Sequence, residues 1–125
     1  WYALVFSLVA AALGARFLAS PQTSGPAGVW VQTIGEDRHF LAELRLEPEG
    51  DHFLATPLEM TEDAYPRQAY RSFDHQFSRD SWSFQEDWGD EVGRFELKRV
   101  GPDRYQGLLF YAGAPEGVPT TFERR

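Results

Sequence analysis

The chain has 125 residues, of which 42 % are hydrophobic and 15 % aromatic, and its formal net charge is −7. This length allows one small domain with a short appendage and excludes a two-domain nucleotide-binding enzyme. The acidic charge disfavours a nucleic-acid partner, and the absence of cysteine excludes disulfides, thiolate catalysis and Cys-ligated metals.

Residues 1–19 form a nearly continuous apolar run that predicts a single transmembrane helix. At about 1.5 Å per residue this helix would be about 28 Å long, close to the thickness of a bilayer core. Its one charged residue, Arg16, lies near the end of the run, where it can reach the headgroups. A cleaved signal peptide is the alternative, because small residues surround Ala15, Ala19 and Ser20. The length of the run favours a retained anchor.

Small side chains in this run predict a contact surface for other membrane helices. Ala11, Gly14 and Ala15 would let a second helix approach closely, which drives helix association in lipid. We therefore expect the anchor to bind the transmembrane helices of a larger membrane complex, as well as the lipid bilayer.

Residues 20–28 are rich in Pro, Gly and Ser and predict a linker, followed by a domain over residues 29–125. All acidic residues of the chain belong to this domain. A domain on the anionic inner leaflet is more often basic, so we expect a single-pass protein of the bacterial inner membrane with a periplasmic domain. Arg16, on the linker side of the run, favours the opposite orientation.

The domain shows apolar residues at every second position, which predicts strands with one buried face. The expected strands are 29–34, 40–46, 53–58, 68–77, 81–85, 92–100, 104–111 and 120–124. The clearest hairpin joins residues 94–100 to 104–111 through the turn Gly101-Pro102-Asp103. We expect an all-β fold, a small antiparallel meander that closes into a barrel or half-barrel, because closure removes exposed strand edges.

Two short segments, Gly28-Val29-Trp30 in the first strand and Tyr105-Gln106-Gly107 in a late one, stand among uninterrupted hairpins. In this order of elements the domain resembles the calycin group, which includes the lipocalins. The resemblance implies a barrel that binds a ligand in its mouth. The chain departs from lipocalins by its shorter length, its lack of cysteine and the absence of a helical pattern at its end. The alternative is a flattened barrel filled by its own aromatic side chains.

Polar residues give only weak signals for chemistry. His39, His52 and His75 are scattered, and we expect them to face solvent on strands or turns, without a metal. The acidic turn over residues 86–91 offers Asp87, Asp90 and Glu91 as weak cation ligands, although an acidic hairpin loop is the simpler interpretation. Residues 113–117 lack the Lys and the helix start of a phosphate-binding loop, and we expect a plain loop there.

The strand over residues 104–111 is partly apolar on both faces, which indicates either a strand in the middle of a packed two-sided structure or one face that meets a partner. Candidates for a partner-facing patch are Tyr65, Pro66, Tyr70, Trp88 and Phe110.

These patterns favour a non-catalytic accessory subunit of a respiratory or photosynthetic membrane complex, with the β-domain capping its outer face. The alternative is a membrane-tethered carrier of an apolar small molecule, such as a lipid or pigment. No cofactor is expected. An enzyme is not expected either, because no acid, base and nucleophile occur at spacings typical of an active site. A carboxyl group in the barrel mouth with a shifted pKa would reopen that question.

Overall fold

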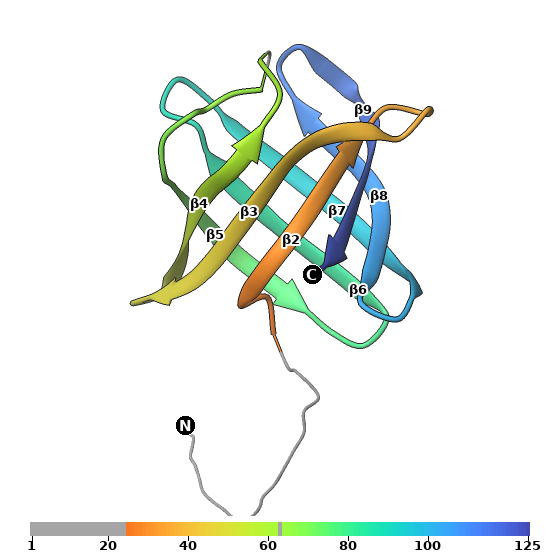
Figure 1. The fold of residues 1–125 in the computed structure, drawn as a ribbon, viewed down its shortest axis with the longest axis horizontal. Coiled ribbons are helices and arrows are strands. Elements are labelled where there is room, and N and C mark those ends of the chain that lie inside the picture. Colours follow the sequence, from red (N-terminus) through yellow and green to blue (C-terminus); the bar gives the residue numbers. More distant parts are fainter. Residues whose placement is uncertain (1–24, 63) are drawn as a thin grey trace, which may run out of the picture.

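The computed structural model describes residues 25–62 and 64–125, which form a barrel of eight antiparallel strands (Figure 1). The strands are β2 (Gly28–Ile34), β3 (His39–Glu49), β4 (His52–Met60), β5 (Tyr70–Phe77), β6 (Ser81–Asp87), β7 (Val92–Gly101), β8 (Arg104–Tyr111) and β9 (Ala114–Arg124). Each strand pairs with the next, and β9 returns to pair with β2, from Trp30 opposite Arg124 to Ile34 opposite Thr120. The predicted all-β meander is confirmed, and it closes completely.

The predicted hairpin between β7 and β8 is also confirmed, with Gly101 paired to Arg104 across the turn. Several predicted strand limits were wrong: β3 and β4 are longer than expected, β5 begins two residues later, and the limits of β9 and β6 differ as follows. β9 begins at Ala114, so most of the expected loop at residues 113–117 is strand, and the positive φ of 92° at Gly117 accommodates a bulge beside Phe110. β6 continues to Asp87, which adds Glu86 to the strand.

The predicted transmembrane helix at residues 1–19 lies outside the described residues. Within residues 25–62 and 64–125, no helix combines the length and apolarity needed to cross a bilayer. β2 begins at Gly28, the last residue of the predicted linker.

One end of the barrel, called the closed end below, is filled by aromatic rings. Trp82 has its ring centroid 4.7 Å from both Trp30 and Phe84, and Phe84 stacks on Phe95 at 4.5 Å. These four side chains are at most 2 % exposed, as is Phe122. Such ring pairs contribute about 0.5–1.5 kcal/mol each beyond the area they bury. The interior at this end is therefore solid.

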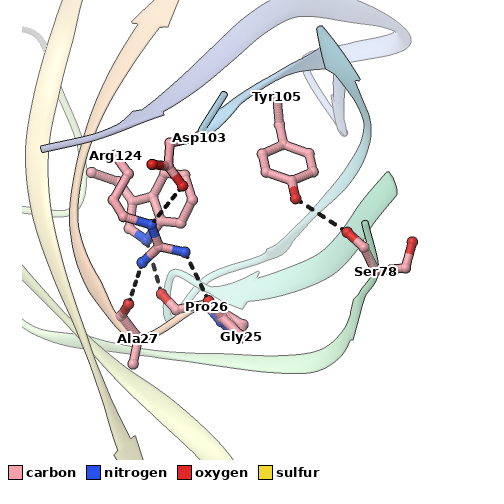
Figure 2. A network of polar contacts seen from close by, with 8 residues as sticks. Gly25, Pro26, Ala27, Ser78, Asp103, Tyr105 and Arg124 are labelled. Carbon is pink, nitrogen blue, oxygen red and sulfur yellow. Dashed lines mark hydrogen bonds and ion pairs between the residues drawn. The ribbon is translucent and has the colours of Figure 1, made fainter. Parts of the chain in front are cut away.

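Arg124 holds the first and last strands together at the closed end (Figure 2). Its guanidinium lies 4.3 Å from the ring centroid of Trp30. It donates hydrogen bonds to the carbonyl oxygens of Ala27 at 2.5 Å and Gly25 at 3.0 Å, and to the Asp103 carboxylate at 3.2 Å. Arg124, near the end of β9, thus contacts three groups at the start of the barrel and one in the turn between β7 and β8, and so it fixes how the chain enters and leaves.

Two residues of β8, Tyr105 and Gly107, also help to hold the closed end together. The Tyr105 hydroxyl donates to the carbonyl oxygen of Ser78 at 3.1 Å (Figure 2). A Cβ atom on Gly107 would lie 2.0 Å from the carbonyl oxygen of Glu96 on β7. The close approach of β7 and β8 therefore requires glycine at this position.

The opposite end of the barrel, called the open end below, is drawn at the top of Figure 1. β4 and β5 pair only from Phe53 opposite Ser72 to Ala55 opposite Tyr70. Beyond Ala55, β4 continues without β5 as far as Met60. The two strands therefore separate at this end, and residues 61–62 and 64–69 belong to the connection between them, called the segment 61–69 below.

Candidate binding cavity at the open end

The open end contains a cavity of about 270 Å³, called the mouth cavity below. Its walls are mostly apolar and come from the inward faces of the strands; they include Ile34, Leu41, Ala42, Met60 and Leu109. Polar and aromatic residues lie around them, namely Tyr65, Tyr70, Glu86, Trp88, Asp90, Glu91 and Tyr111. A concave, mainly apolar site with a few polar groups is the usual form of a small-molecule site.

Two polar residues that line the mouth cavity, Gln32 and Glu86, are almost fully buried, and Glu86 is the one that can carry a charge. It follows Trp82 and Phe84 on the inward face of β6, and it is only 4 % exposed. Its Oε1 accepts a hydrogen bond from Trp88 Nε1 at 2.9 Å, and its Oε2 accepts one from the Tyr70 hydroxyl at 3.2 Å. In the described part of the chain, Glu86 takes part in no ion pair.

Burial raises the pKa of Glu86 to about 7, against the opposing effect of the hydrogen bonds from Trp88 and Tyr70. Both protonation states fit the same geometry. Trp88 can only donate, so Oε1 remains an acceptor in both states. The Tyr70 hydroxyl can donate to an ionised carboxylate or accept from a protonated one, and burial raises its own pKa well above the usual value. Glu86 can therefore gain or lose a proton near neutral pH without a change in its partners.

Tyr65 joins the segment 61–69 to the loop after β6. Its hydroxyl donates to the carbonyl oxygen of Trp88 at 3.0 Å and lies 3.4 Å from a carboxylate oxygen of Asp90. The segment itself is held by Arg67, which donates to the carbonyl oxygens of Thr61 and Glu62. Tyr65 is 60 % exposed, so it covers the rim of the mouth cavity from outside.

The structure brings three of the five predicted partner-facing residues together, whereas Pro66 and Phe110 do not line the mouth cavity. Tyr65, Tyr70 and Trp88 all line the mouth cavity, where the polar atoms of Tyr70 and Trp88 bind Glu86. Phe110 lies elsewhere, beneath the guanidinium of Arg94 at 4.4 Å. The membrane-helix candidates Ala11, Gly14 and Ala15 lie outside the described residues. Whether any of these residues binds a partner stays a prediction.

The three acidic candidates for a cation site have separate partners. The Asp87 carboxylate accepts from the backbone N–H of Gly89 at 2.9 Å, Asp90 lies near Tyr65, and Glu91 accepts from the N–H of Ala112 at 2.9 Å. Among residues 25–62 and 64–125, no three His, Cys, Asp or Glu side chains are placed to hold a metal ion together. Each carboxylate here therefore stabilises a loop.

The expectation of solvent-facing histidines was wrong for His75. His39 and His52 are the first residues of β3 and β4, and each binds carboxylates at the adjoining turn. His75 instead stacks on Phe84 at 4.8 Å, and burial lowers its pKa to about 4. Its Nδ1 accepts from Trp82 Nε1 at 3.0 Å, so the ring proton is on Nε2, which lies 2.7 Å from the Ser72 hydroxyl. An imidazole that donates to a serine cannot remove its proton, so Ser72 is not activated as a nucleophile.

The sequence interpretation missed Glu86 as a site residue, because it ended the strand at Gln85 and read residue 86 as part of an acidic loop. The signal was available in the alternation of Trp82, Phe84 and Glu86, which continues the inward face by one position. Compared with known proteins, the chain matches no family model and no curated sequence. The geometry of the mouth cavity is therefore the basis for a functional proposal.

Proposed function

We propose that the protein binds a small, largely apolar molecule in the mouth cavity. The observation that carries this proposal is the difference between the two ends of the barrel: rings fill the closed end, while about 270 Å³ at the open end is lined by apolar walls around a buried carboxyl group. A domain that only caps a complex has no need of such a cavity. The proposal corresponds to the carrier hypothesis from the sequence.

The volume narrows the class of ligand. One water molecule occupies about 30 Å³ of liquid, so 270 Å³ corresponds to about nine water-sized groups. This is near the lower end of the range for ligand pockets, roughly 300–1,000 Å³. A ligand with about ten non-hydrogen atoms fits this space better than a long-chain lipid or a large pigment.

Thermal denaturation of the 125-residue chain with small aromatic probes tests the proposal. Suitable probes are phenethylamine, phenethyl alcohol and phenylacetate, which share one ring and differ in charge. A ligand at about 100 times its Kd stabilises the native state by about 2.7 kcal/mol. We expect at least one probe to raise the melting temperature.

A cavity-filling variant localises the effect. Ala42→Phe places a ring in the mouth cavity, because Ala42 lines it and is 2 % exposed, and should abolish the shift in melting temperature. Leu58→Phe is the control, because Leu58 is 42 % exposed on the outside of β4. Shifts that persist in Ala42→Phe, or no shift with any probe, would contradict binding in the mouth cavity.

General acid–base catalysis is a second candidate, favoured by Glu86 alone. A carboxyl group with a pKa of about 7 can transfer a proton at neutral pH, the property of a general acid or base. The test is to incubate a bound ligand with the wild type and with Glu86→Gln and to analyse it by mass spectrometry. A product formed by the wild type alone would establish catalysis.

The family and the cellular setting remain proposals. The closed antiparallel meander, with Trp30 and Tyr105 at its closed end, is compatible with a calycin-like barrel. The anchor over residues 1–19, the periplasmic location and the accessory role in a membrane complex rest on the sequence patterns described above. Identifying the proteins that purify with the full chain from native membranes would test all three.

A further inference from the structure

The charged residues of the mouth cavity all have the same sign. The cavity is lined by three carboxylate side chains, Glu86, Asp90 and Glu91, and no Lys, Arg or His from residues 25–62 or 64–125 lines it. The titratable groups that share the cavity with Glu86 are Tyr65 from segment 61–69, Tyr70 from β5, Asp90 and Glu91 from the loop after β6, and Tyr111 from β8. None of these groups can supply a positive charge.

The only polar partners that Glu86 has in the barrel are neutral. Trp88 and Tyr70 occupy one acceptor position on each carboxylate oxygen, whereas an ionised carboxylate offers about four such positions. A buried charge without a counter-ion is strongly unfavourable. A positively charged ligand would supply the missing counter-ion to Glu86, while a neutral or anionic ligand would not.

Aromatic side chains, called the aromatic rim, surround the same place: Tyr65, Tyr70, Trp88 and Tyr111. Trp88 and Tyr111 meet edge to face with ring centroids 5.6 Å apart. The faces of Trp and Tyr rings attract ammonium groups, and the attraction is stronger where water is excluded. The aromatic rim and Glu86 therefore favour the same charge.

Resting on the binding function proposed above, we propose that the ligand is a small amine whose ammonium group pairs with the Glu86 carboxylate inside the aromatic rim. Its apolar part lies against the walls formed by Ile34, Leu41 and Met60. The amine binds as the ammonium ion to the ionised carboxylate, so a protein that holds a proton on Glu86 releases that proton to the buffer on binding.

The three probes separate this inference from the binding function. Phenethylamine should bind at least about tenfold more tightly than phenethyl alcohol, and phenylacetate should bind weakest, because a desolvated charge pair changes affinity by this much or more. If the alcohol binds as tightly as the amine, or phenylacetate binds tightest, the amine inference is overturned and the binding function stands. If no probe binds, both fail.

Two variants locate the source of the preference. Glu86→Gln should lose the preference for the amine while retaining the affinity for the alcohol, since the side-chain amide keeps the size of the group. Glu116→Gln removes one charge from an exposed position outside the mouth cavity and should leave all three affinities unchanged. Equal losses in both variants would mean that net charge, and not Glu86, attracts the amine.

Calorimetry on the wild type gives a readout that does not depend on any variant folding. Burial raises the pKa of Glu86 to about 7, so at pH 6 most molecules carry the proton that the amine displaces. Binding heats measured in two buffers of different ionisation enthalpy should reveal release of up to about one proton per amine. Heats that do not depend on the buffer would overturn the pairing with Glu86.

Discussion

At the closed end of the barrel, Trp30, Trp82 and Phe84 meet ring against ring, whereas at the open end the same sheet surrounds a cavity with Glu86 at its wall. β6 contributes to both, because Trp82, Phe84 and Glu86 follow one another along its inward face. The difference therefore arises from side-chain size and from the separation of β4 and β5. The closed end supplies stability, and the open end is free to carry a binding site.

The largest difference between the two ends should appear on truncation of tryptophan. Trp82→Ala removes a fully buried ring and should lower the free energy of unfolding by about 3–5 kcal/mol, because the neighbouring rings cannot fill the space. Trp88→Ala, at the half-buried rim, should cost about 1–2 kcal/mol. Urea denaturation measures both. Equal losses would show that the open end contributes as much stability as the closed end.

The close approach of β7 and β8 can be broken by one methyl group. Gly107→Ala should cost about 3 kcal/mol, since its Cβ would collide with the backbone of Glu96 and the strands would have to move apart. Gly101→Ala is the matched control on the same strand pair, where the nearest atom would be 3.9 Å away. Chemical denaturation of the two variants should separate them clearly. A stable Gly107→Ala protein would contradict the required close contact.

Glu86 and His75 should give opposite pH dependences. The pKa of Glu86 rises from 4.5 to about 7 on folding, so its contribution to stability is present below pH 4.5 and is lost as the pH rises to about 7. That loss is about 3 kcal/mol at 1.36 kcal/mol per unit. The pKa of His75 falls from 6.5 to about 4, so its contribution is present above pH 6.5 and is lost as the pH falls toward 4.

The free energy of unfolding of the wild type, measured across pH 4–8, should therefore change little between about pH 4.5 and 6.5, where the two effects oppose each other. In Glu86→Gln the opposing effect of Glu86 is removed while that of the buried His75 remains, and stability should rise with pH between about 4 and 6.5. A variant whose profile matches that of the wild type would show that Glu86 titrates normally, and it would remove the physical basis for a special carboxyl group at the open end.

The smallest predicted effect compares two arginines that lie over aromatic rings. Arg124→Ala should cost about 2 kcal/mol, because it removes the contact with Trp30 and leaves carbonyl groups of residues 25 and 27 without their donor. Arg94→Ala loses a contact with Phe110 and an exposed ion pair with Glu96, and should cost about 0.5 kcal/mol or less because such surface pairs contribute little. The melting temperatures of the two variants, compared with that of the wild type, test this difference. Similar values would mean that Arg124 does not secure the closed end.

The strands could be predicted because their signals are local. Alternation in residues 94–111 and the turn at Gly101 identify a hairpin without knowledge of the rest of the chain. The mouth cavity could not be predicted from the sequence. It depends on how many residues of β4 and β5 pair, and no local pattern specifies that number. Glu86 shows the limit most clearly. Because Asp87, Asp90 and Glu91 follow it closely, Glu86 looks like the start of an acidic loop until the strand is known to continue.

The hydrogen bonds from Arg124 to Gly25 and Ala27 also place both ends of the described chain at the same end of the barrel. The described chain enters at Gly25 and leaves at Arg125 beside the same pole, and the mouth opens at the other (Figure 1). A tether that reaches the barrel through Gly25, or a fusion partner attached after Arg125, therefore meets the barrel at the closed end, away from the mouth. Capture of a ligand from solution and attachment of the protein need not compete for space.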